Sequence, residues 1–74
     1  MLLDKLAERL VQRLRERSWT IATGESLTAG LVSSTIASVP GCSAVFRGTV
    51  VAYAPEVKTE VLNVPEELLR QGIV

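Results

Sequence analysis

Two short runs of strand-forming residues, separated by a segment with the length of a helix, most constrain the fold of this chain. The runs span residues 19–23 and 44–53 and are rich in β-branched and aromatic side chains. The segment between them predicts a helix that starts near Ser26 or Leu27 and runs to about Ser38. Two strands joined by a crossover helix are typically parallel neighbours or near-neighbours in one sheet.

Three further helices surround this unit in the sequence. Residues 2–17 predict an amphipathic helix, because their leucines, with Ala7 and Val11, recur at three- and four-residue spacing on one face. Shorter helices are predicted over residues 54–62 and 65–71, each with a proline near its start. The order helix-strand-helix-strand-helix-helix predicts an α/β chain, a partial three-layer α/β/α sandwich whose second half is missing.

The length of the chain limits how it can be stabilised. A domain of 74 residues buries only about 60% of its unfolded surface. Two strands are too few for a covered sheet that is stable alone. We therefore expect residues 1–74 to form a single partial domain, completed by further chain or by a partner, and we expect a homo-oligomer.

Composition excludes several classes of function. Eight basic and eight acidic residues sum to zero, which argues against a nucleic-acid partner. The longest apolar runs fall far short of the about 20 residues of a membrane span, and the N-terminus does not resemble a signal peptide. With a single cysteine, Cys42, these features predict a cytoplasmic protein without a membrane partner. The chain has no histidine, so Ser-His-Asp and Cys-His catalysis are excluded, and we expect neither a metal nor a cofactor.

The joint between the first strand and the following helix, residues 22–30, reads Ala-Thr-Gly-Glu-Ser-Leu-Thr-Ala-Gly. Neither the Walker nor the Rossmann glycine spacing is present. Two interpretations remain. In the first, Ser26 or Thr28 caps the helix by accepting a backbone N–H of its first turn, the commoner role of such residues. In the second, Ser26 is a nucleophile beside a helix start that suits an anion or oxyanion.

A serine nucleophile without histidine needs another base. A lysine amine can serve when its surroundings favour the neutral form, and a tyrosine hydroxyl can relay the proton. Tyr53 ends the second strand, and Lys58 follows five residues later. Because the carboxyl ends of parallel strands share one edge of a sheet, these residues and Ser26 would converge there. Taken singly, a solvated strand-end tyrosine and a surface lysine are the more ordinary interpretations.

Taken together, these segments resemble the first half of the C-terminal domain of the competence-damage-inducible protein (CinA) family, the nicotinamide-nucleotide amidases. The family's hallmark, Thr-Ala-Glu-Ser-Cys-Thr-Gly-Gly, is similar to residues 23–30. Residues 39–46 resemble its Pro-Gly-Ser-Ser-x-x-Phe run, and residues 48–58 are close to its Gly-x-Val-x-Tyr-Ser-Asn-Glu-x-Lys pattern. The resemblance covers essentially the whole chain.

The resemblance implies an activity and a set of roles. The activity is hydrolysis of the carboxamide of nicotinamide mononucleotide, a small nucleotide substrate, to nicotinic acid mononucleotide and ammonia. Ser26 would be the nucleophile, Lys58 the general base and Tyr53 an assistant in proton transfer. Glu25 is expected to belong, with Thr28, Ala29 and Gly30, to the substrate-binding and oxyanion residues, where it would pair with Lys58 or hold the turn.

The resemblance also directs attention to the residues after Ser26. N–H donors for the tetrahedral intermediate would come from the first turn of the helix, around Thr28, Ala29 and Gly30.

Several positions depart from the family pattern. Leu27 replaces cysteine and is expected to crowd the pocket wall. Ala29 replaces a glycine where the backbone can require φ > 0, and Gly24 replaces an alanine and is expected to loosen the turn. The family domain also continues for about as many residues again, so the alternative to an amidase is a non-catalytic module that binds a ligand or associates with itself.

Overall fold

The computed structural model describes residues 2–72. The predicted order of helices and strands is confirmed, with one additional 3-10 turn. The elements are α1 (Leu2–Glu16), β1 (Ile21–Glu25), α2 (Leu31–Ala37), η1 (Cys42–Ala44), β2 (Phe46–Val51), α3 (Pro55–Glu60) and α4 (Glu66–Arg70).

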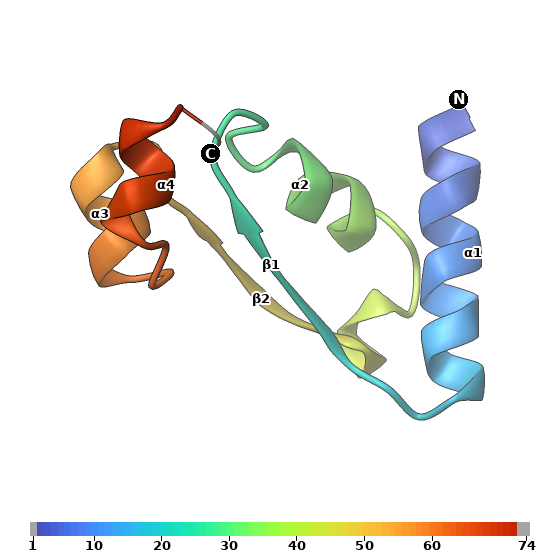
Figure 1. The fold of residues 1–74 in the computed structure, drawn as a ribbon. Helices are drawn as coiled ribbons and strands as arrows, with labels where there is room; N and C mark the ends of the chain where they lie inside the picture. Colours follow the sequence, from blue (N-terminus) through green and yellow to red (C-terminus); the bar gives the residue numbers. More distant parts are fainter. Residues whose placement is uncertain (1, 73–74) are drawn as a thin grey trace.

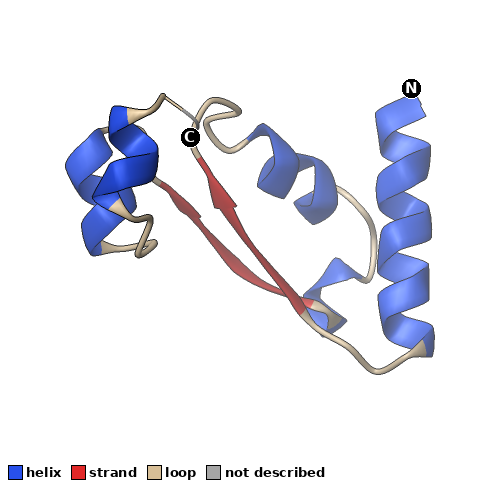
Figure 2. Ribbon diagram, viewed as in Figure 1, coloured by secondary structure: helices blue, strands red, loops and turns tan. Residues whose placement is uncertain are grey.

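The two strands form a parallel pair, as the crossover helix predicts. The register runs from Ile21 opposite Phe46 to Glu25 opposite Val51, with a bulge after Ile21 that leaves Arg47 unpaired. Figure 1 shows α2 lying between the strands and α1, while α3 and α4 lie beyond the other side of the strands. The same arrangement, coloured by element type in Figure 2, is a fragment of an α/β fold with helices on both sides of a two-stranded sheet.

The core lies between α1, α2 and the strand starts. Its buried residues are Ala7, Val11, Leu14, Ile36, Val39 and Val45, with Ile21, Cys42 and Phe46 packed against them. The amphipathic face of α1 is only partly covered, because α2 has seven residues against the fifteen of α1. Leu3, Leu6 and Leu10 therefore remain 49%, 50% and 37% exposed.

The first predicted strand is displaced by two residues. It begins at Ile21 rather than Trp19 and extends through Glu25. Trp19 instead donates its backbone N–H to the Leu14 carbonyl at 2.9 Å, and its ring, 59% exposed, lies 5.4 Å from the Arg17 guanidinium carbon. Glycine and glutamate are poor strand formers, so Glu25 joins the strand because β2 supplies a pairing partner.

The second helix also starts later than predicted. It begins at Leu31, not near Ser26 or Leu27, and residues 26–30 form turns. The reason is local, because Ala29 and Gly30 have φ of 50° and 97°, outside the right-handed helical region.

Residues 2–72 hold neither a membrane-spanning helix nor a metal-binding group of side chains. None of the helices described there has the length and apolar content to cross a membrane. Nor does that part of the chain gather three or more histidine, cysteine, aspartate or glutamate side chains in a metal-binding group.

Candidate active site

The carboxyl ends of the two strands are joined directly. The Ala52 N–H donates to the Glu25 carbonyl at 2.7 Å, so Ser26 and Tyr53 follow the strands at the same edge of the sheet. Lys58 lies in α3, which begins four residues after β2 ends. The structure thus places the three predicted catalytic residues around one edge, although no hydrogen bond joins their side chains within residues 2–72.

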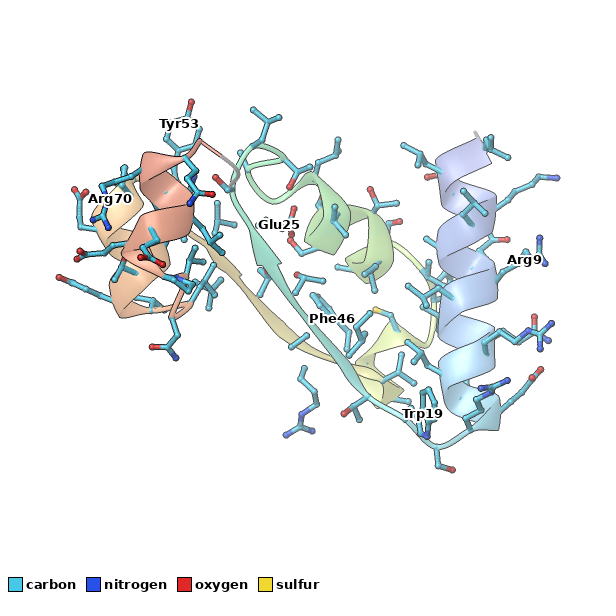
Figure 3. All side chains as sticks on the ribbon, in the orientation of Figure 1. Arg9, Trp19, Glu25, Phe46, Tyr53 and Arg70 are labelled. Atoms are coloured by element: carbon cyan, nitrogen blue, oxygen red, sulfur yellow. The ribbon has the colours of Figure 1, made fainter. Side chains whose placement is uncertain are left out.

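The three side chains differ in exposure. Tyr53 is 71% exposed, and Figure 3 shows its hydroxyl pointing away from the body of the molecule. Ser26 and Lys58 are half-buried. Tyr53 therefore matches the ordinary interpretation of a strand-end tyrosine in solvent, whereas Ser26 and Lys58 are partly shielded from water.

Two successive turns carry the chain from Ser26 into α2. The Ala29 N–H donates to the Ser26 carbonyl at 3.0 Å, and the Leu31 N–H donates to the Thr28 carbonyl at 3.0 Å. The left-handed backbone at Ala29 and Gly30 closes this segment. Ser26 is therefore the first residue of a defined turn rather than of a helix.

The carboxylate of Glu25 fills the space between this turn and the start of α2. Its Oε1 accepts the Thr28 hydroxyl at 2.9 Å and the N–H groups of Gly30 and Val32 at 3.1 and 2.9 Å. Its Oε2 accepts the Ser33 N–H at 2.9 Å. Glu25 is only 5% exposed, and Figure 3 shows its side chain directed toward α2.

A pair of threonines extends these contacts across the sheet. Thr23 and Thr49 face each other in the register, and the Thr23 hydroxyl donates to Thr49 Oγ1 at 2.8 Å. The Thr49 hydroxyl then donates to Glu25 Oε2 at 3.3 Å. The carboxylate thus receives five donors from β2, the turn and α2.

These donors determine the ionisation of Glu25. Burial alone raises the pKa of this carboxyl, but hydrogen bonds from Ser33, Thr28 and Val32 outweigh it and lower the pKa from 4.5 to about 2. Glu25 is consequently ionised throughout the neutral range, where it matches the positive end of the α2 dipole.

The structure revises the predicted roles at the joint. Neither Ser26 nor Thr28 caps α2, because Glu25 accepts the N–H groups that were assigned to them. The Glu25 carboxylate accepts hydrogen bonds from Thr28 and Gly30 of the turn, and no ion pair joins it to Lys58 within residues 2–72. One feature of the sequence could have indicated this role, because Glu25 is the sole acidic residue between Glu16 and Glu56.

The predicted oxyanion donors are also revised. The Ala29 and Gly30 N–H groups already donate to the Ser26 carbonyl and to Glu25. Within residues 2–72, the N–H groups of Leu27 and Thr28 have no acceptor. These two consecutive donors directly follow Ser26 in the chain.

The structure shows the surroundings of the three residues that depart from the family hallmark, Gly24, Leu27 and Ala29. Ala29 does occupy a position with φ > 0, so the expected backbone restriction is confirmed. Leu27 is 88% exposed, and it lies on the surface instead of crowding a pocket wall. Gly24 lies in β1, not in the turn, and a Cβ there would come within 3.2 Å of Leu62 Cδ2.

Comparison with known proteins assigns the family. The model of the CinA C-terminal domain matches residues 3–74. The chain belongs to the CinA C-terminal domain family. A CinA-like protein of Dictyoglomus turgidum is 47% identical over 66 residues, 89% of this chain. A second CinA-like protein, from Thermotoga neapolitana, is 46% identical over 68 residues, 92% of this chain.

Solved CinA structures share the fold. The competence/damage inducible protein CihA from Agrobacterium tumefaciens superposes with a TM-score of 0.87 at 29% identity over 92% of this chain. The chain spans 41% of that protein and 16% of the Dictyoglomus turgidum relative. It is thus a CinA-like chain that corresponds to one part of its longer relatives.

The ionisation of Glu25 makes folding stability depend on pH. Because the folded-state pKa lies below the unfolded value, the stabilisation is complete above pH 4.5 and is lost as the pH falls toward about 2. Urea unfolding between pH 7 and 2 should show this loss in the parent chain. In Glu25→Gln, stability should be lower at pH 7 and should vary less over that window, with exposed Glu60→Gln as the control. A Glu25→Gln chain with the parent's pH dependence would contradict the assignment.

The left-handed turn predicts opposite effects for two neighbouring substitutions. Ala29→Gly should stabilise by about 0.5–1 kcal/mol, because it relieves an L-residue at φ 50°. Gly30→Ala should destabilise by about 1–2 kcal/mol through its φ of 97°. A steric clash is not the cause, since the new Cβ would lie 3.7 Å from Val51 Cγ2. Urea midpoints measure both changes, and shifts of the same sign would refute the turn geometry.

Proposed function

We propose that this CinA-family chain carries the nucleophilic part of an amidase that hydrolyses the carboxamide of nicotinamide mononucleotide. The observation that carries the proposal is the shared sheet edge. A 2.7 Å bond between Ala52 and Glu25 fixes the strand ends from which Ser26 and Tyr53 emerge. Lys58 lies on the helix that starts from the same edge.

The proposed reaction begins with attack of the Ser26 hydroxyl oxygen on the carboxamide carbon. The hydroxyl proton passes to the side-chain amine of Lys58, directly or through the Tyr53 hydroxyl. The carbonyl oxygen becomes an oxyanion, which the adjacent N–H groups of Leu27 and Thr28 stabilise.

Collapse of the tetrahedral intermediate breaks the carbon–nitrogen bond. The leaving amide nitrogen takes the proton held by Lys58 and departs as ammonia, leaving an ester on Ser26. Water, deprotonated by the same lysine, then attacks this ester and releases nicotinic acid mononucleotide and the free serine.

The exposure pattern favours this division of roles. Lys58 is half-buried beside the sheet edge, whereas Lys5 is exposed on α1. The Tyr53 hydroxyl is in solvent in this state, so its part in proton transfer requires rotation of the side chain toward Ser26.

The proposal predicts ammonia release that depends on Ser26. The purified 74-residue chain with nicotinamide mononucleotide should release ammonia, and Ser26→Ala should abolish it. Lys58→Met should lower the rate by roughly 10²–10⁴-fold, the usual contribution of a general base, while Lys5→Met should leave it unchanged. A folded parent chain without ammonia release would refute amidase activity and favour the non-catalytic module.

We also propose that the chain self-associates through α1 and α2. A groove of about 360 Å³ lies between these helices, and its apolar lining includes Leu3, Leu6, Leu10, Leu31 and Val32. Its walls are largely exposed hydrophobic side chains, which in soluble proteins commonly mark an interaction surface. A second copy of this chain suits the groove, because a net charge of zero gives no overall repulsion between copies.

Sedimentation equilibrium tests this association. The parent chain should sediment as a dimer or larger assembly, and Leu6→Glu should shift it toward the monomer by placing a charge in the groove. Leu27→Glu is the matched control, since Leu27 is 88% exposed and does not line the groove. A monomeric parent chain would contradict the proposal.

A further inference from the structure

The geometry points to Glu25 as a positioning residue for Ser26, an inference that rests on the proposed amidase function. Glu25 does not touch the reacting atoms in this account and acts only through the turn.

Both the backbone and the side chain of Glu25 act as anchors. On the N-terminal side of Ser26, the Glu25 carbonyl accepts the Ala52 N–H at 2.7 Å, which ties the residue to β2. On the C-terminal side, the Glu25 carboxylate accepts the Thr28 hydroxyl and the Gly30 N–H. Ser26 is thus held between two points that belong to one residue.

The turn itself removes further freedom. The Ser26 carbonyl accepts the Ala29 N–H at 3.0 Å, so the backbone of Ser26 is fixed from both directions. Rotation about χ1 is then the main motion left to the Ser26 hydroxyl. The neighbouring N–H groups of Leu27 and Thr28 lie in the same held segment, so nucleophile and oxyanion donors are positioned together.

The number of donors excludes a role for Glu25 in proton transfer. A carboxylate offers about four lone-pair directions, and Glu25 already receives five donors from Thr28, Gly30, Val32, Ser33 and Thr49. It has no accepting capacity left for the proton of Ser26. The same occupancy reserves the N-terminus of α2 for Glu25, so the phosphate of a nucleotide has to be bound elsewhere.

Misplacement of a nucleophile by about 1 Å can lower a rate by 10²-fold. Glu25→Gln keeps the shape of the side chain, but its NH2 group faces N–H donors instead of accepting from them. We expect kcat to fall by about 10²-fold per folded molecule, with KM for nicotinamide mononucleotide within about threefold of the parent value. A merely structural role would lower the melting temperature and leave kcat of the folded fraction unchanged.

The experiment compares the 74-residue parent, Glu25→Gln, Glu25→Asp and the control Glu56→Gln, an exposed acid in the first turn of α3. Steady-state kinetics are measured well below the melting temperatures, with amide ¹⁵N relaxation of Ser26, Leu27 and Thr28. Glu25→Asp keeps the charge but is one methylene shorter, so it should recover only part of kcat. Glu56→Gln should match the parent in both measurements.

The outcomes separate the inference from the proposed function. Lower kcat with more mobile Ser26–Thr28 amides in Glu25→Gln supports positioning. Parent-like kcat, or parent-like amide order in the folded variant, overturns it. If the parent does not turn over, the amidase proposal fails, and relaxation alone decides whether Glu25 holds the turn. If Glu25→Gln does not fold, Thr28→Val removes one donor, and an unchanged kcat with unchanged amide order would overturn the inference.

Discussion

The ionised carboxylate of Glu25 is the interaction on which the rest of this structure depends. It is buried at the end of β1 and receives donors from the turn, from α2 and from β2. A buried carboxylate without such donors would be costly, and the first N–H groups of α2 would otherwise need another acceptor. The Glu25 carboxylate therefore gains donors and the first N–H groups of α2 gain an acceptor. These hydrogen bonds hold β1, the turn and α2 together as one unit.

This arrangement explains why residues 26–30 form turns and not the start of α2. It also explains where the proposed reaction of Ser26 would take place. With the helix start occupied by Glu25, the available backbone donors move toward Ser26, to Leu27 and Thr28. The bond from Ala52 to Glu25 places the end of β2 beside the same segment. The parallel register thus places Ser26, the proposed nucleophile, at the same edge as Tyr53, with Lys58 on the following helix. The leucines of α1 remain partly exposed and line a groove with α2 and with Thr28 of the turn.

Periodicity and residue type predicted the order of helices and strands and the parallel pairing of the two strands. They also predicted that Ser26, Tyr53 and Lys58 lie around one edge of the sheet. The hallmark around Ser26 gave the family, which the match over residues 3–74 confirmed. The start of α2 was predicted wrongly because alanine favours helices, whereas Ala29 adopts φ 50° here. The cap was assigned to Ser26 or Thr28 because capping rules consider residues next to the helix. Glu25 lies six residues before Leu31, and only the three-dimensional turn brings its carboxylate back to the helix.

The most direct test of this account is the ionisation of Glu25 itself. The carboxyl carbon of this side chain can be followed by ¹³C NMR in the folded 74-residue chain as the pH is lowered. We expect a pKa of about 2 for Glu25, because the hydrogen bonds that it accepts from Ser33, Thr28 and Val32 outweigh its burial. A Glu25 pKa at or above its ordinary value of 4.5 would show that the carboxylate does not hold the turn and the helix together.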